Sequence, residues 1–330
     1  MELDELDARL VHALQVEPRA AWTDLAPIVG ADPATLARRW NRLRREGIAW
    51  TSGYLEPPQV AIVELDHNRS GTREVPTQLT HHPEVLVVDV CSGSRDLLLI
   101  VTARDISSLT EFVTGSAGLQ GFGAVRTHLI SDLLSDGSDW RLRALSPTEV
   151  EQLPKPPPPR ARAARTVPDD LASAIARAIW VDGRASVASI AASSGFAPQR
   201  VSDAIAVLRA SGELRLRTDV ARAASSWPIY AWYFVEAPAR TVESARTRIV
   251  AVPEVRLAAV CASRYNLILA VWLRTLADVN RFEIALGNAL DGARVADRAV
   301  VLRMVKQVGR LLGPDTRAIG DPPNDPPPAR

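Results

Sequence analysis

Apolar and polar positions alternate with a helical period over residues 6–45. The first helix is indicated by apolar side chains at three- and four-residue spacing, namely Leu6, Leu10, Val11 and Leu14. A second segment, residues 23–29, stops at Gly30, a residue type that ends helices in the left-handed conformation. Asp32-Pro33 then supplies an N-cap and a first-turn proline for a third helix. The pattern predicts three short helices with a tight turn before the third.

The third predicted helix carries an apolar stripe of Leu36, Trp40 and Leu43, which indicates the face that is buried. Gly47 ends this helix, and residues 48–55 have the pattern of a short strand or ribbon. Three helices followed by a ribbon are typical of a winged helix-turn-helix domain.

After Pro57-Pro58 the periodicity changes to that of an α+β domain. The expected order is strand, helix, strand, strand, helix, strand, over residues 59–66, 75–82, 85–91, 97–102, 107–115 and 124–130. This is the ferredoxin-like βαββαβ plan, in which helices cover one face of a four-stranded antiparallel sheet.

The second half of the chain repeats the first. At an offset of 165 residues, Leu25-Ala26, Gly30, Leu43 and Gly47 recur as Ile190-Ala191, Gly195, Leu208 and Gly212. At an offset of 170, Pro83-Glu84-Val85 and Cys91 recur as Pro253-Glu254-Val255 and Cys261. The same βαββαβ order is expected over residues 227–236, 241–250, 255–261, 267–274, 277–290 and 299–305. Such a long period predicts a duplicated two-domain unit.

The predicted fold class is α+β, with two winged helix-turn-helix domains, each followed by a ferredoxin-like domain. The expected segments are a first winged helix-turn-helix domain (1–56), a ferredoxin-like domain (57–135), a linker (136–168), a second helix-turn-helix domain (169–222), a second ferredoxin-like domain (223–312) and a tail (313–330). Dense proline over 154–168 predicts a basic, semi-rigid polyproline II linker, and the proline-rich tail is expected to be disordered.

The composition is that of a chain that can bury a core. Of its 330 residues 47% are hydrophobic and 23% are charged, and the net charge is +1, so binding to nucleic acid requires local segregation of charge. The chain has no apolar stretch of membrane-spanning length, an acidic start unlike a signal peptide, and two cysteines, too few for a disulfide framework. We therefore expect a cytoplasmic protein. Without a Walker loop, nucleophile elbow or zinc spacing, we expect no catalytic residue, metal or cofactor.

Positive charge is concentrated on the third predicted helix. Residues 33–50 hold five arginines and one acid, whereas residues 1–32 hold seven acids and two arginines. Arginine suits phosphates and guanine edges, and asparagine suits adenine. The candidates for contact with double-stranded DNA are Thr35, Arg38, Arg39, Asn41, Arg42 and Arg45. The alternative is a solvated face with intrahelical ion pairs.

The corresponding helix of the second half has lost most of this charge. Residues 198–212 contain two arginines, Arg200 and Arg209, and Asp203 stands at the position of Arg38. Ser202 is still suited to a phosphate contact. We expect this copy to bind DNA weakly, or to serve as a scaffold or dimer surface.

Polar turns join the second and third strands of each predicted sheet. The candidate residues for binding a small zwitterionic effector are Ser92, Gly93, Ser94 and Asp96 in the first turn and Tyr265 and Asn266 in the second. A glycine followed by a polar side chain offers backbone N–H groups and a carboxylate or amide to such a ligand. The alternative is a hairpin turn with a capping aspartate.

At this point the sequence resembles the Lrp/AsnC family of feast-famine transcription regulators, in a tandem-duplicated form. The resemblance is carried by Asp7, Leu14, Leu25-Ala26, Gly30, Arg38-Arg39-Trp40-x-Arg42-Leu43-x3-Gly47-Ile48, His82-Pro83-Glu84-Val85, Gly93-x-x-Asp96 and residues 97–101. It covers about residues 1–135 and again about 169–308. The resemblance implies a domain that binds an effector such as an amino acid near Gly93 and Asp96, and assembly into a homodimer or higher homo-oligomer. Within one chain, the two ferredoxin-like domains would pack as a pseudo-dimer with the linker spanning them.

One enzyme class also resembles this pattern. Sirohaem decarboxylases carry a tyrosine-asparagine-leucine segment where this chain has Tyr265-Asn266-Leu267, and they generally place histidines beside it. Here Arg264 precedes the segment and no histidine follows it in the sequence. The arginine-rich third helix favours the regulator, and the enzyme is the alternative.

Overall fold

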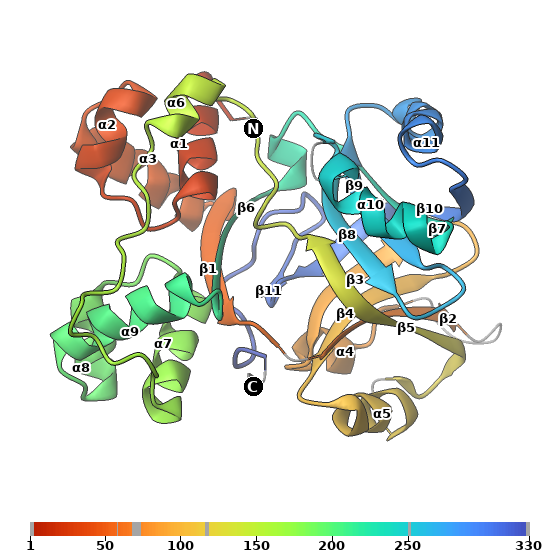
Figure 1. Cartoon of the computed structure of the whole chain (residues 1–330), viewed down its shortest axis with the longest axis horizontal. Helices are drawn as coiled ribbons and strands as arrows, with labels where there is room; N and C mark the ends of the chain where they lie inside the picture. The colour runs from red at the N-terminus through yellow and green to blue at the C-terminus, as the bar shows by residue number, and fades with distance from the viewer. Residues whose placement is uncertain (1–2, 58, 68–73, 116–118, 250–251, 328–330) are drawn as a thin grey trace.

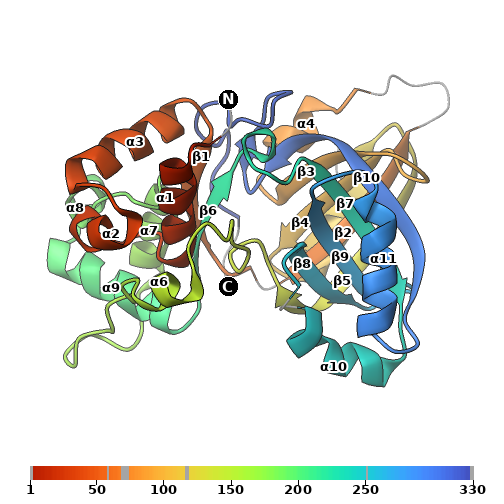
Figure 2. The ribbon, with the colours of Figure 1, turned by 90° about the horizontal axis from the view of Figure 1, so that it is seen from above.

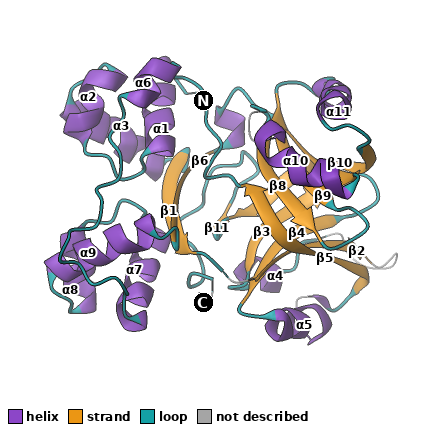
Figure 3. Cartoon of the chain, viewed as in Figure 1, coloured by secondary structure: helices purple, strands orange, loops and turns teal. Residues whose placement is uncertain are grey.

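The computed structural model describes residues 3–57, 59–67, 74–115, 119–249 and 252–327. Two groups of helices lie on one side of the molecule, and a sheet with helices on its outside lies on the other (Figures 1 and 3). The last residue of the helix expected over 241–250 and the last three residues of the tail lie outside the described residues.

The first group of helices, called the first head, consists of α1 (Glu5–Val16), α2 (Trp22–Val29), α3 (Pro33–Arg45) and strand β1 (Ala49–Leu55). Capping residues set its helix ends. The Asp4 carboxylate accepts the amide of Asp7 at 2.8 Å, and the Asp32 carboxylate accepts the amide of Thr35 at 2.9 Å. Gly30, at a φ of +89°, ends α2. The three helices and the ribbon strand expected from the sequence are confirmed.

The second group, called the second head, consists of α7 (Asp169–Val181), α8 (Val187–Ser194), α9 (Pro198–Ala210) and strand β6 (Leu214–Val220), followed by the 3-10 turn η2 (Arg222–Ala224). It presents the same order of elements as the first head. Its core is separate from that of the first head and includes Leu171, Ile175 and Ile205.

The two heads are joined by a two-stranded antiparallel sheet, here called the ribbon, in which β1 pairs with β6 from Ala49–Val220 to Leu55–Leu214. Two arginines hold the heads together in a reciprocal manner. Arg19 donates to the carbonyls of Gly183 and Ala185, both at 2.7 Å, and Arg184 donates to those of Pro18 and Ala20 at 2.6 and 2.9 Å. Each head therefore gives one arginine to two carbonyl groups of the other head, as expected for two bodies related by a local two-fold axis.

Eight strands form a closed antiparallel sheet beside the heads (Figure 1). They are β2 (Gln59–His67), β3 (Val85–Cys91), β4 (Leu97–Ala103), β5 (Phe122–Ser135), β7 (Ile229–Glu236), β8 (Val255–Cys261), β9 (Leu267–Leu273) and β10 (Arg294–Gln307). The first half contributes the order β3-β4-β2-β5 and the second half β8-β9-β7-β10. Because β5 pairs with β8 and β10 pairs with β3, the two four-stranded sheets close on each other.

The outer faces of the closed sheet are covered by helices. The helices are α4 (Thr77–His81) and α5 (Ile106–Gly115) on the first half, and α10 (Ala239–Ile249) and α11 (Asp278–Ala289) on the second. Leu99 and Phe112 belong to the first outer core, and Leu269 and Phe282 to the second. The opposite strand faces line the inside and include Trp232. Period-two alternation in the strands therefore separates an inner core from two outer cores.

Strands β5 and β10 are longer than expected. The sequence pattern predicts strands over 124–130 and 299–305, whereas each observed strand has 14 residues. The additional residues at the end of each strand pair across the two halves, as in Leu133 with Ala259 and Gln307 with Val87, whereas those at the start of β10 pair with β7 of the same half. This pairing depends on a distant part of the chain, which local periodicity cannot reveal.

The linker and the tail differ most from their expected form. Residues 136–153 contact both the first head and the second half of the sheet. The amide of Leu145 donates to His12 Nδ1 at 2.8 Å, and Glu149 of α6 (Pro147–Glu151) pairs with Arg9 at 2.6 Å. Trp140 instead donates to the carbonyl of Pro253 at 2.9 Å and packs against Trp272. The tail is not disordered over residues 313–327.

A backbone strap formed by β11 (Arg310–Leu311) and the tail runs between the heads. The amide of Ala318 donates to the carbonyl of Gly47 at 2.9 Å, and Trp180 Nε1 donates to the carbonyl of Asn324 at 2.9 Å. A Cβ at residue 47 would lie 2.2 Å from the Ala318 oxygen, so the strap requires glycine there.

Asp89 on β3 is a buried titratable group inside the closed sheet. It is 0% exposed, and its Oδ2 accepts from Trp232 Nε1 at 3.1 Å. Burial raises the pKa of this carboxyl to about 7, although Trp232, Tyr230 and Arg222 lower it. An unfolded aspartate titrates near 3.8, so the folded chain keeps a proton that the unfolded chain releases between these values. The free energy of unfolding contributed by Asp89 therefore falls as pH rises from about 4 to 7.

Asp89→Asn should reduce this fall, because asparagine keeps the size of the side chain and does not titrate. Between about pH 5 and pH 8 its free energy of unfolding should decline less than that of the unsubstituted chain by about 2–3 kcal/mol. Urea denaturation across this range measures the difference. Asp132→Asn, at a half-exposed carboxylate of β5, is the control and should keep the original slope. Equal slopes for all three proteins would contradict the assignment.

Candidate DNA interface and effector turns

The face of α3 that points to solvent carries three of the predicted DNA contacts. Arg38, Asn41 and Arg45 are exposed, whereas Trp40 and the rest of the apolar stripe are buried. Thr35 is half-buried and accepts a hydrogen bond from Arg38 Nη2 at 3.1 Å. The structure therefore places Thr35, Arg38, Asn41 and Arg45 together along one accessible side of the helix.

The other two candidates, Arg39 and Arg42, are engaged in ion pairs with the start of α1. Arg39 Nη1 lies 2.6 Å from Asp4 and 2.9 Å from Asp7, and Arg42 Nη2 pairs with Asp7. The Asp7 side chain is 4% exposed, so these contacts anchor a buried carboxylate. For these two arginines the ion-pair alternative has structural support, although the pairs join two helices rather than residues of one.

The second head presents its third helix differently. Arg160 of the linker donates two hydrogen bonds to the Asp203 carboxylate on α9, from Nε at 2.7 Å and from Nη2 at 2.5 Å. Pro157 and Pro158 of the linker border the same groove, together with Ser202. The outward face of α9 is thus partly covered by the linker, and Figure 2 shows α9 and α3 on opposite sides of the heads.

In the two polar turns, Asp96 and Asn266 play the same structural part. The Asp96 carboxylate accepts the amide of His67 at 2.8 Å. The Asn266 side chain accepts the amide of Ala237 at 3.0 Å and donates to its carbonyl at 2.8 Å. Each residue ties its turn to the end of a neighbouring strand, which favours the turn-capping alternative for both.

The remaining turn residues contact the other half of the chain. Ser92 Oγ accepts the amide of Val300 at 3.0 Å, and Ser94 Oγ donates to Asp297 at 2.6 Å. Gly93 adopts a φ of +91°, which a side chain would strain. The structure brings these turn residues against β10 rather than around an open cavity.

A buried charged network that the sequence analysis missed lies behind the first turn. Arg95, with its side chain 1% exposed, donates to Glu64 at 2.5 Å and to Asp297 at 2.6 Å. His128 Nε2 lies 2.6 Å from the same Glu64 carboxylate. Burial alone raises the pKa of Glu64, but His128 and Arg95 outweigh it and hold that pKa below its ordinary value. Glu64 interrupts the apolar run of its strand on the face of Ile62, and this interruption is a signal in the sequence.

The same network places a histidine beside the tyrosine-asparagine-leucine segment. The His128 ring centroid lies 5.7 Å from that of Tyr265, and His128 Nδ1 lies 2.9 Å from Ser263 Oγ. The sequence suggested that no histidine accompanies this segment, because His128 comes from the other half of the chain. The pairing of β5 with β8 brings the two together.

Two domain matches agree with this architecture. Residues 3–44 match the AsnC-type helix-turn-helix domain, and residues 60–138 match the Lrp/AsnC ligand binding domain. The first head with the first part of the closed sheet is therefore a helix-turn-helix module joined to a ligand-binding module.

Three relatives with the name of HTH-type transcriptional regulators are similar to part of this chain. The HTH-type transcriptional regulator AldR of Mycolicibacterium smegmatis is 31% identical over 123 residues, covering 34% of this chain and 71% of AldR. The uncharacterized HTH-type transcriptional regulator y4tD of Sinorhizobium fredii is 30% identical over 121 residues, covering 34% and 72%. An uncharacterized HTH-type transcriptional regulator of Pyrococcus abyssi is 27% identical over 140 residues, covering 40% and 89%. The chain belongs to the Lrp/AsnC family of transcriptional regulators.

Over most of its length the fold is also similar to that of the siroheme decarboxylase NirDL. The likeness covers 92% of this chain and 93% of that chain, with a TM-score of 0.60 at 14% identity. The complex of NirDL with an iron-uroporphyrin III analogue gives 0.59 at 15%. At this identity the comparison shows a shared fold.

Two further properties concern only the part of the chain that the structure describes. No helix there is long and apolar enough to cross a membrane. No group of three or more histidine, cysteine, aspartate or glutamate side chains there has the arrangement to hold a metal ion. Cys91 and Cys261 are free, buried thiols, and burial raises the pKa of Cys261 to about 12.

The ion pair of Arg42 with Asp7 should contribute measurably to stability. Arg42→Ala should lower the free energy of unfolding by about 1–2 kcal/mol, because it leaves the buried Asp7 carboxylate with fewer partners. A double-mutant cycle with Asp7→Ala in urea denaturation measures the coupling. Arg45→Ala, at an exposed position of the same helix, is the matched control and should change stability by less than about 0.5 kcal/mol. Additive effects of Arg42→Ala and Asp7→Ala would refute the pairing.

Proposed function

We propose that this protein is a sequence-specific DNA-binding regulator of transcription in which α3 enters the major groove of double-stranded DNA. The observation that carries the proposal is the AsnC-type helix-turn-helix match, combined with the exposure of Arg38, Asn41 and Arg45 on the third helix. Arginine and asparagine on such a helix can read guanine and adenine edges. Thr35, Arg39 and Arg42 remain candidates for phosphate or base contacts at the edge of this face.

We infer that the second half of the chain is a diverged second unit of the same family. Its head and its strands follow the same order as those of the first half, and Arg19 and Arg184, 165 positions apart, make matching bonds to the opposite head. The cross-pairing of β5 with β8 and of β10 with β3 supports a pseudo-dimer of two ligand-binding domains within one chain. The linker packs on the second of these domains through Trp140 and then runs along the heads.

The second head then serves as a scaffold rather than a second reader of DNA. Asp203 stands where the first head has Arg38, and its carboxylate is paired with Arg160 of the linker. A palindromic operator needs two reading helices, so the working assembly is a homodimer or higher homo-oligomer. The localisation that follows is the cytoplasm.

The ligand-binding match supports regulation by a small-molecule effector, such as an amino acid. Ser92, Gly93, Ser94, Asp96, Tyr265 and Asn266 are the candidates at the turns. Their bonds within the chain favour a capping role for Asp96 and Asn266, so the effector is better sought in an open cavity.

Arg38→Ala should weaken binding to the operator by about 1–3 kcal/mol if Arg38 contacts a base, and should leave the free energy of unfolding nearly unchanged. Fluorescence anisotropy with a labelled duplex from the promoter region next to the protein's own gene measures the affinity. The same titration at several salt concentrations gives the number of phosphates contacted.

Arg200→Ala, an exposed arginine on α9, is the matched control and should leave DNA affinity unchanged. A loss of affinity in Arg200→Ala equal to that in Arg38→Ala would show that both heads read DNA. If neither substitution changes affinity, the role of α3 is refuted.

A second candidate function is that of a decarboxylase related to NirDL, favoured by the shared fold and by His128 beside Tyr265. His128 is buried and bonded to Glu64 and Ser263, which argues for a structural role. We expect no change in the ultraviolet-visible spectrum of added sirohaem when the purified chain is titrated in. A saturable shift of its Soret band that disappears in His128→Ala would instead favour the enzyme.

A further inference from the structure

The proline-rich part of the linker carries positive charge and no negative charge. Residues 154–168, here called the basic segment, contain no acid and four exposed cations, which are Lys155, Arg160, Arg162 and Arg165. Arg160 is the one cation of the segment that forms an ion pair with a described residue, Asp203. Lys155 borders a groove that also holds Asp24. The other two cations are left to solvent.

The basic segment is anchored to the second head at two points. Arg160 donates both of its hydrogen bonds to the Asp203 carboxylate on α9, and Val167 packs on the apolar core of the second head. Arg162 and Arg165 lie between these anchors, so the chain holds them at the surface of that head. Figure 1 shows this part of the linker running from α6 along the heads to α7.

The anchor on α9 corresponds to a predicted DNA contact of the first head. Asp203 lies 165 positions after Arg38, and the two heads have the same order of elements. Arg38 is exposed on the outward face of α3. The Arg160 side chain, 56% exposed, therefore lies on the face of α9 that corresponds to the face of α3 predicted to meet DNA. The linker returns to this face the kind of charge that the helix itself lacks.

The basic segment makes the second head the more positive of the two. Residues 1–56 hold seven cations and nine acids, whereas residues 154–222 hold eleven cations and six acids. Without the basic segment, residues 169–222 hold seven cations and six acids. The excess of positive charge on the second head thus comes mainly from the linker.

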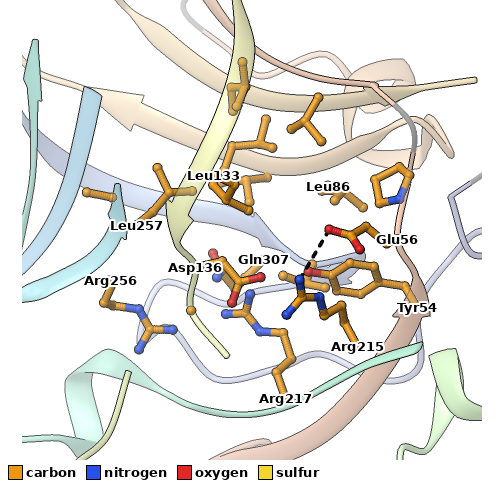
Figure 4. A pocket seen from close by; sticks show the side chains of 18 of the residues that line it. Tyr54, Glu56, Leu86, Leu133, Asp136, Arg215, Arg217, Arg256, Leu257 and Gln307 are labelled. Carbon is orange, nitrogen blue, oxygen red and sulfur yellow. Dashed lines mark hydrogen bonds and ion pairs between the residues drawn. The ribbon is translucent and has the colours of Figure 1, made fainter. Parts of the chain in front are cut away.

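This excess is not cancelled by the acids that follow it. Residues 169–170 are aspartates in the first turn of α7, where a carboxylate offsets the positive end of the helix dipole. The cavity between the ribbon and the closed sheet is different, because its arginines are balanced. There Arg215 pairs with Glu56 at 3.3 Å (Figure 4), and Arg217 pairs with Asp219 at 2.7 Å. The surface that has cations to spare is the basic segment.

We propose that the basic segment binds the phosphate backbone of the duplex whose bases α3 reads. This contact rests on the proposed function, and it gives the second head a part in DNA binding that does not depend on sequence. Arginine neutralises phosphates whatever the neighbouring bases are, and each contact releases counterions. Two heads related by a local two-fold axis can meet successive half-sites, about 10 base pairs apart. The segment then meets the backbone about one helical turn from the bases read by α3.

The salt dependence of DNA binding tests this contact. The variant Arg162→Gln/Arg165→Gln of the full chain is titrated, by fluorescence anisotropy, into the operator duplex and into a shuffled duplex of equal length. The slope of log affinity against log salt should become shallower by about 2 per bound chain. At about 0.1 M salt the affinity for both duplexes should fall about tenfold, and the preference for the operator should stay the same.

Two further variants control for charge and for structure. Arg162→Lys/Arg165→Lys keeps both charges and should keep the original slope, because a phosphate accepts either cation. Arg104→Gln/Arg240→Gln removes the same charge at exposed positions after β4 and on α10, and should also keep the slope. If the linker variant with two glutamines has the same slope as this control, the proposal is overturned.

A cleavage probe locates the contact on the duplex. Cys91 and Cys261 are buried, so Arg162→Cys introduces an exposed thiol that can be labelled selectively with an iron chelate that cuts nearby DNA. Cuts are expected about one helical turn, or ~10 base pairs, from the bases protected by α3. The same label on Arg240→Cys should give none. A labelled Arg162→Cys protein that binds the operator without cutting it contradicts the contact.

Arg38→Ala separates this proposal from the proposed function. If Arg38→Ala loses the preference for the operator while the glutamine variant of the linker keeps the original slope, the backbone contact is refuted and the regulator stands. If the glutamine variant has a shallower slope while Arg38→Ala has no effect, the backbone contact stands and reading by α3 is refuted. A chain that binds no duplex at low salt refutes both.

Discussion

Each four-stranded half of the closed sheet has two edge strands, and both are covered by the other half: β5 by β8, and β3 by β10. An exposed edge offers unpaired N–H and C=O groups to other chains, so covering both edges at once satisfies the backbone and prevents unwanted pairing. The same constraint operates in the heads, where β1 has a partner only through β6 among the described strands. The halves are therefore complete only together, and the charged network around Arg95, which reaches Glu64 in one half and Asp297 in the other, is buried because of this closure.

The arginines of this chain divide into those that hold the structure and those left to meet a ligand. Arg19 and Arg184 fasten the heads to each other, and Arg42 secures α3 to α1. Arg38 and Arg45 keep their side chains in solvent. A count of positive charge along a helix therefore overstates the charge available to DNA, since acidic residues distant in sequence neutralise part of it. On the second head the roles are reversed, because Arg160 of the linker neutralises Asp203 and partly covers that face of α9.

Local periodicity predicted most of the helices and strands, because caps such as Asp32 and the alternation within β3 and β4 act over a few residues. It missed the short elements α6 and β11. The exposed side of α3 was predictable for the same reason. Contacts between the halves were not: the extra length of β5, the burial of Trp140 in the linker and the approach of His128 to Tyr265 all depend on pairing over more than a hundred residues. The binding of Arg217 and Arg256 to the same carboxylate, that of Asp219, was equally hidden, since the two arginines become neighbours only after β6 and β8 are placed.

Strand β10 is the last long strand of the chain, and it pairs with both β3 and β7. During synthesis the sheet consequently stays open until this strand has left the ribosome, and two edges, one from each half, remain unprotected until that moment. A message cut short before residue 294 would yield a polypeptide with the complete first head but with an unsealed sheet. Such a fragment would expose unpaired strand edges, the kind of surface that chaperones and proteases recognise in incompletely folded chains.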